Sequence, residues 1–137
     1  MFKFIEEHKV YFVYIPLVIY WIILLTLTSL PSGMAITVDV SDKVNHFGAY
    51  GLLSVLLFLT MKFQMKYPFL KKNANWLTIL IASTYGVLDE LHQMLVPGRS
   101  AEFLDWLADF SGSLIGVLII QWLLKRYYYL AFQKKQI

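Results

Sequence analysis

Four long apolar stretches dominate this chain, and they cover residues 11–30, 44–61, 76–96 and 101–124. A transmembrane helix needs about 20 predominantly apolar residues, and each stretch approaches or reaches that length. Only 15% of the residues are charged, against about 25% in soluble domains. We therefore expect an all-α integral membrane protein, with four transmembrane helices packed as a bundle. In 137 residues these helices leave room for one domain, spanning residues 1–137.

The first stretch is longer than the apolar region of a secretory signal peptide and has no convincing cleavage site. We expect it to be retained as the first helix. The Pro97-Gly98 pair lies between the third and fourth stretches and predicts a tight turn joining two antiparallel helices.

The basic residues predict the orientation of the bundle. Ten of the twelve Lys and Arg residues precede the first stretch, separate the second from the third, or follow the fourth. Only Lys43 and Arg99 lie at the other end of the helices. Because basic loops stay in the cytoplasm, we expect cytoplasmic N- and C-termini in a multi-pass protein of the cell membrane. The net charge of +3 then reflects topology and attraction to anionic lipid, and we expect no nucleic-acid partner.

Polar residues recur at helical spacing near the predicted outer end of three stretches. Five of the nine acidic residues fall between residues 85 and 112. Residues three or four positions apart share one face of a helix. This spacing groups Asp42, His46 and Tyr50; Gly86, Asp89, Glu90 and Gln93; and Glu102, Asp105, Asp109, Gly112 and Gly116. Charges inside a membrane face one another or a water-filled cavity, so we expect a polar cleft open to the outer face.

Some of these residues have ordinary structural explanations. Acids at helix starts, such as Asp42 and Glu102, complement the helix dipole, and Gly112 with Gly116 is typical of close helix packing. His92 points away from the polar face of its stretch. The predicted ligand-binding residues are Asp42, Lys43, His46, Tyr50, Glu90, Gln93, Arg99, Asp105 and Asp109. The candidates for a catalytic role are His46, Glu90, Asp105 and Asp109.

Neighbouring carboxylates raise one another's pKa, so the predicted cluster needs protons or cations. Three arrangements would relieve the repulsion between these carboxylates: a protonated carboxyl group, a bound divalent cation, or ion pairs with Lys43 and Arg99 that leave a slot for a lipid headgroup. The ligand set matches no recognised metal motif, so we assign no metal, and the cofactor stays open. The absence of cysteine excludes thiol chemistry.

Two segments, "DKVNHFGAYGLL" and "YGVLDELHQMLVPGRSAEFLDWLADFSGSLIG", resemble the VanZ-like family of small bacterial membrane proteins. The residues that carry the resemblance are Asp42, Lys43, His46, Tyr50, Glu90, Gln93, Pro97, Gly98, Arg99, Asp105, Gly112 and Gly116. The family often has Asn where this chain has Asp109. The resemblance implies a link with the bacterial cell envelope, because the name-giving member is associated with low-level teicoplanin resistance. It implies no settled reaction.

Two functions follow as hypotheses. In the first, the outward cleft engages a membrane lipid, a lipid-linked cell-wall precursor or the acyl tail of a lipoglycopeptide. In the second, the protein is a small intramembrane transferase or hydrolase acting on a lipid-linked envelope substrate. Movement of protons or ions through the cluster, and a purely structural polar knot, remain as further alternatives.

Overall fold

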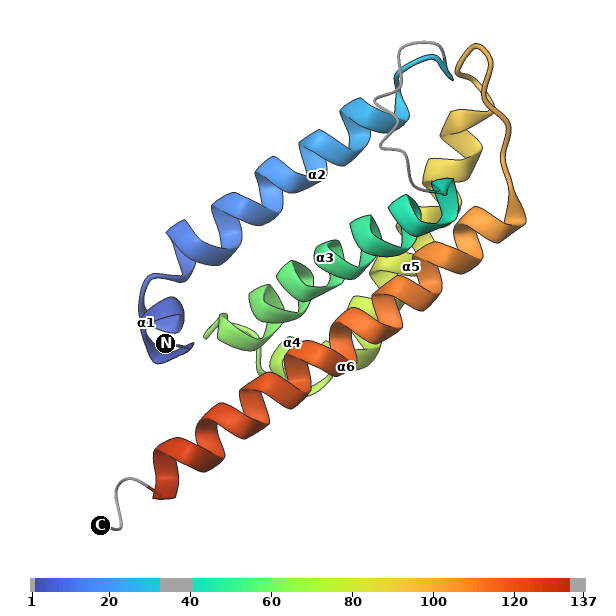
Figure 1. Ribbon diagram of the computed structural model, residues 1–137. Coiled ribbons are helices and arrows are strands. Elements are labelled where there is room, and N and C mark those ends of the chain that lie inside the picture. The colour runs from blue at the N-terminus through green and yellow to red at the C-terminus, as the bar shows by residue number, and fades with distance from the viewer. Residues whose placement is uncertain (1, 33–40, 134–137) are drawn as a thin grey trace.

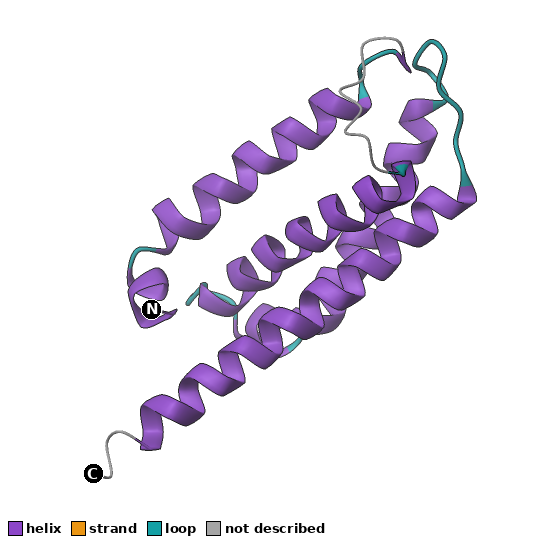
Figure 2. Cartoon of the chain, viewed as in Figure 1, coloured by secondary structure: helices purple, strands orange, loops and turns teal. Residues whose placement is uncertain are grey.

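The computed structural model describes residues 2–32 and 41–133, and within these ranges the chain is helical and has no strands (Figures 1 and 2). The predicted outer segment between the first two stretches includes residues 33–40, and Lys134 and Lys135 follow the last helix; these positions lie outside the described residues. The elements are α1 (Phe2–Glu7), η1 (Val10–Tyr14), α2 (Ile15–Thr28), α3 (Asp42–Phe63), α4 (Pro68–Lys72), α5 (Ala74–Gln93) and α6 (Phe103–Gln133). The all-α class is confirmed.

Three helical stretches are long and apolar enough to cross a membrane: Val10–Thr28, Asp42–Phe63 and Phe103–Gln133. Helix α5 has 20 residues, but Asp89, Glu90 and Gln93 in its last turns lower its hydropathy. A fourth crossing by α5 therefore stays a prediction, as does the cytoplasmic side of the termini. Large exposed side chains are mostly apolar, such as Val18 on α2 and Trp122 on α6. This surface suits contact with lipid chains.

The four long helices run side by side, and α1 lies at the same end of the bundle as the last turns of α6 (Figure 1). Helix α3 packs most extensively against α6, and α5 packs against both. The end that holds the α5–α6 loop is the predicted outer end. This packing places the first turns of α3 and α6 beside the last turns of α5.

The helix boundaries differ most from the sequence expectation at the C-terminal ends of α5 and α6. Helix α5 ends at Gln93 rather than 96 because the following residues form the predicted turn: the Arg99 N–H donates to Val96 O at 3.1 Å, and Gly98 has φ +76°. Glycine tolerates this left-handed conformation without strain. Helix α6 continues to Gln133 rather than ending at 124. Its 31 residues span about 46 Å, more than the roughly 30 Å hydrocarbon core.

Glycines set the close crossing of α3 and α6. A Cβ at Gly112 would lie 2.1 Å from Phe47 O, and a Cβ at Gly116 would lie 2.4 Å from Gly51 O. Contacts this short leave no room for a methyl group, so the helix backbones touch here. The predicted small-residue packing is confirmed, and it brings the polar face of α6 directly against that of α3.

Candidate functional site

Seven polar side chains are buried together at the predicted outer end of α3, α5 and α6. We call them the polar cluster: His46, Tyr50, Asp89, Glu90, Gln93, Asp105 and Asp109. Each helix contributes residues from its buried stripe, at the three- and four-residue spacing that places side chains on one face. Lower in the bundle, the same stripes carry large apolar residues such as Phe58 and Ile120. The change from apolar to polar along one stripe confines the cluster to one end.

Asp109 is the most deeply buried member of the cluster, and it pairs with His46. His46 Nδ1 lies 2.9 Å from Asp109 Oδ1, and the two residues are 9% and 0% exposed. Gly86 on α5 makes room for this carboxylate, because a Cβ there would lie 3.0 Å from Asp109 Oδ2. The pair joins α3 to α6 and fixes the orientation of the imidazole ring.

Lys43 marks the rim of the cluster. Its ammonium lies 2.9 Å from Asp105 Oδ1 and also forms a hydrogen bond with Glu102. Asp105 is buried, whereas the Lys43 and Glu102 side chains are 38% and 49% exposed. The hydrogen bond from Lys43 holds the pKa of Glu102 below its usual value. Asp42 is exposed at the same rim. The rim of the cluster therefore exposes one cation, Lys43, and two acids, Asp42 and Glu102.

Asp89 and Glu90 have neutral donors instead of cations. Tyr50 Oη donates to Asp89 Oδ2 at 3.4 Å, and the Glu102 backbone N–H donates to Glu90 Oε2 at 2.7 Å. Within the described residues, no Lys or Arg forms an ion pair with either carboxylate. Buried charge of one sign is costly unless it is neutralised. Asp89 and Glu90 therefore need a proton or a bound cation to neutralise their charge.

The cluster offers donors that could hold a divalent cation. One ring nitrogen of His46 and one oxygen each of Glu90 and Asp109 lie within 4.8 Å of one another, and Asp42, His46 and Asp105 form a second such group. Imidazole together with carboxylate oxygens suits several divalent metals. The sequence alone assigned no metal, because no known motif has this spacing. The geometry is compatible with a metal ion and equally with a shared proton.

Arg99 ties the α5–α6 loop to the end of α2. Its guanidinium donates to Leu30 O at 2.9 Å, to Leu27 O at 3.3 Å and to Gln93 Oε1 at 3.3 Å. The residue is half-buried. Two of these bonds satisfy carbonyl groups at the C-terminal end of α2, because the last carbonyl groups of a helix have no partner within the helix. Arg99 therefore contacts the edge of the polar cluster through Gln93.

A family profile described as VanZ/LLP1 matches residues 11–125. The chain belongs to the VanZ/LLP1 family. The matched range contains the whole polar cluster, so the resemblance noted in the sequence is confirmed. No curated protein and no solved structure matches the chain.

The structure brings most of the predicted site of this VanZ/LLP1 chain together. The predicted residues that are buried in the cluster are His46, Tyr50, Glu90, Gln93, Asp105 and Asp109. Lys43 and Asp42 lie at its rim, and Arg99 lies in the adjoining loop. Asp89 was placed on the polar face but omitted from the predicted ligands, and the structure shows it 3% exposed and bonded to Tyr50. Its neighbour His92 is half-buried and lies off the stripe.

Proposed function

We propose that this protein acts in the bacterial cell envelope by engaging the polar head of an amphiphile with its polar cluster. The amphiphile is a membrane lipid or a lipid-linked cell-wall precursor at the outer leaflet. The observation that carries the proposal is the convergence of four carboxylates and a histidine from three helices at one end of the bundle. Membership of the VanZ/LLP1 family supports it, because the VanZ-like resemblance links such chains to teicoplanin resistance.

Lys43 is the cation best placed to meet a phosphate. It is partly exposed, and it already contacts Asp105 inside the cluster and Glu102 outside it. An incoming phosphate would take over charge-assisted hydrogen bonds from the ammonium, while the buried donors and acceptors below select the rest of the headgroup. Arg99 was also a predicted ligand-binding residue, but its guanidinium is held by the backbone oxygens of Leu27 and Leu30. We assign Arg99 the positioning of the loop above the cluster.

The test is teicoplanin susceptibility in a sensitive bacterial host. Glu90→Gln and Asp105→Asn change charge at the cluster with almost no change in volume, and we expect both to abolish protection given by the wild-type chain. Glu7→Gln is the matched control, because Glu7 pairs with Lys3 at the other end of the molecule with both side chains exposed. Full protection by the cluster variants at normal protein levels would contradict the proposal.

The His46–Asp109 pair favours a second candidate, a transferase or hydrolase acting on a lipid-linked envelope substrate. A histidine held by a buried carboxylate at 2.9 Å is the arrangement of a general base with its orienting group. His46→Gln keeps a polar side chain but removes the base. Mass spectrometry of lipid extracts from cells with wild-type protein, His46→Gln or no protein tests this candidate. A lipid and precursor profile identical in all three would contradict catalysis.

A further inference from the structure

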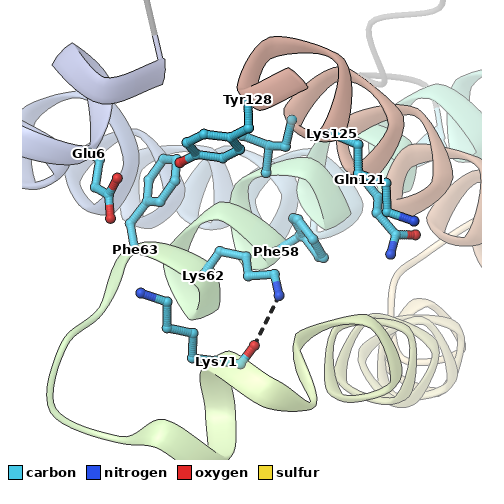
Figure 3. Close-up of a pocket in the computed structure, with 9 residues that line it drawn as sticks. Glu6, Phe58, Lys62, Phe63, Lys71, Gln121, Lys125 and Tyr128 are labelled. Atoms are coloured by element: carbon cyan, nitrogen blue, oxygen red, sulfur yellow. Dashed lines mark hydrogen bonds between the residues drawn. The ribbon is translucent and has the colours of Figure 1, made fainter. Parts of the chain in front are cut away.

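A pocket of about 560 Å³ lies at the opposite end of the bundle from the polar cluster, between α1, α3, α4 and α6 (Figure 3). Its walls include the side chains of Phe58, Phe63 and Leu124. Figure 3 shows the rings of Phe63 and Tyr128 on one side of this space and the Lys62 and Lys71 side chains on the other. The pocket therefore combines an apolar wall with a basic rim, and its volume is typical of small-molecule sites.

Three lysines line the pocket, Lys62, Lys71 and Lys125, and Glu6 is the single acidic residue among the lining side chains. Lys62 Nζ donates to the Lys71 backbone O at 3.2 Å and lies 5.8 Å from the centre of the Phe58 ring. These contacts hold the Lys62 ammonium between the apolar wall and the rim. The lining residues thus carry three cations against one acid, which leaves an excess of positive charge.

The Gln64 side chain helps to hold the shape of the loop beside the pocket. Gln64 Nε2 donates to Tyr67 O at 2.6 Å, and the Tyr67 N–H donates back to Gln64 Oε1 at 2.7 Å. This pair closes the chain tightly between α3 and α4, so the backbone of α4, which carries Lys71, is held beside the end of α3. A preformed site loses less conformational entropy when a ligand binds.

We propose that this pocket binds one anionic phospholipid. The phosphate lies among the three lysines, and the first part of an acyl chain lies against Tyr128, the exposed aromatic side chain of the pocket lining. In the predicted orientation this end faces the cytoplasmic leaflet, where anionic lipids gather beside basic residues. The proposal is independent of the function assigned to the polar cluster, because the two sites lie at opposite ends of the bundle and share no residue.

The experiment adds lipid to the detergent-purified full chain and counts retained lipid by native mass spectrometry. We expect wild-type protein to retain one phosphatidylglycerol per chain and to retain phosphatidylcholine at least tenfold more weakly. The triple variant Lys62→Gln, Lys71→Gln, Lys125→Gln should bind phosphatidylglycerol roughly tenfold or more weakly, because each lysine near a lipid surface contributes favourably. Gln121→Trp, which fills the pocket and keeps all three lysines, should also weaken binding.

The matched control is Lys66→Gln, Lys72→Gln, Arg126→Gln, which removes the same charge from the same end of the chain without touching the pocket lining. It should bind as wild type. Equal losses in the two triple variants would show a general surface attraction and overturn the proposal. Equal retention of phosphatidylcholine would overturn it as well, as would full competition by soluble glycerol phosphate. Thermal unfolding of every variant confirms that each is folded.

Discussion

At the scale of single residues, the four buried carboxylates are balanced unequally. Asp109 faces a histidine and Asp105 faces a lysine. In the part of the chain that the structure describes, Asp89 accepts a hydrogen bond from a tyrosine hydroxyl, and Glu90 accepts one from a backbone N–H. The cost of a buried charge depends on the partner that neutralises it. The two α5 carboxylates, Asp89 and Glu90, therefore need a proton, a metal cation or a positively charged group of a ligand to neutralise them.

Removing the rim lysine should destabilise the protein. Lys43→Met leaves Asp105 buried without its cation, and an unsatisfied buried acceptor costs about 1 to 3 kcal/mol. We expect a loss of this size in the free energy of unfolding in detergent micelles. Lys3→Met should change it by well under 1 kcal/mol, because the Lys3–Glu7 pair is exposed.

The double variant Lys43→Met, Asp105→Asn provides the check on this explanation, because it removes the lysine and the charge that depends on it together. It should recover part of the lost stability. If the double variant lost as much stability as the two single variants together, or more, the assigned ion pair would be contradicted.

Asp109 offers a second test, because the VanZ-like pattern often has Asn at this place. Asp109→Asn keeps an oxygen for His46 and removes one buried negative charge, so we expect stability equal to or above that of wild type. Asp109→Leu leaves the His46 ring nitrogen unpaired and should cost about 1 to 3 kcal/mol. Denaturant titration in micelles compares the two. Equal destabilisation by both variants would show that His46 depends on the ionised carboxylate.

At the scale of helices, the crossing of α3 and α6 positions the site. The backbones touch at Gly112 and Gly116, one and two turns below Asp109. A small increase in separation at this crossing would pull Asp109 away from His46. The site geometry thus depends on residues that have no polar side chain at all.

Alanine substitutions test that crossing. Gly112→Ala and Gly116→Ala would each place a methyl group within 2.4 Å of a backbone oxygen on α3, so we expect losses of about 1 to 3 kcal/mol from overpacking. Gly48→Ala is the matched control on α3, because nothing lies within 4 Å of its added Cβ. It should be neutral or stabilising by up to about 1 kcal/mol. Thermal unfolding in micelles ranks the three, and similar losses in all three would contradict the close crossing.

At the scale of the whole molecule, the apolar stretches predicted the all-α class, the residue spacing predicted the polar stripes, and the Pro97-Gly98 pair predicted the α5–α6 turn. The helical period places Asp105 and Asp109 on one face whatever surrounds them. The pairing of residues between helices could not be predicted, because spacing within one helix does not say which side chain of another helix it meets. The Tyr50–Asp89 contact and the anchoring of Arg99 on α2 are of this kind. The end of α6 was also missed, because a helix does not stop where its residues become polar.

The predicted topology places the polar cluster at the cell-exterior end of a four-span bundle. The chain has no cysteine, so single cysteines at Ser100, beside the cluster, and at Lys66, at the other end, report accessibility without background. A membrane-impermeant maleimide added to intact cells should label Ser100→Cys at once and label Lys66→Cys only after the membrane is permeabilised. Labelling of Lys66→Cys but not Ser100→Cys in intact cells, or of both equally, would contradict the account.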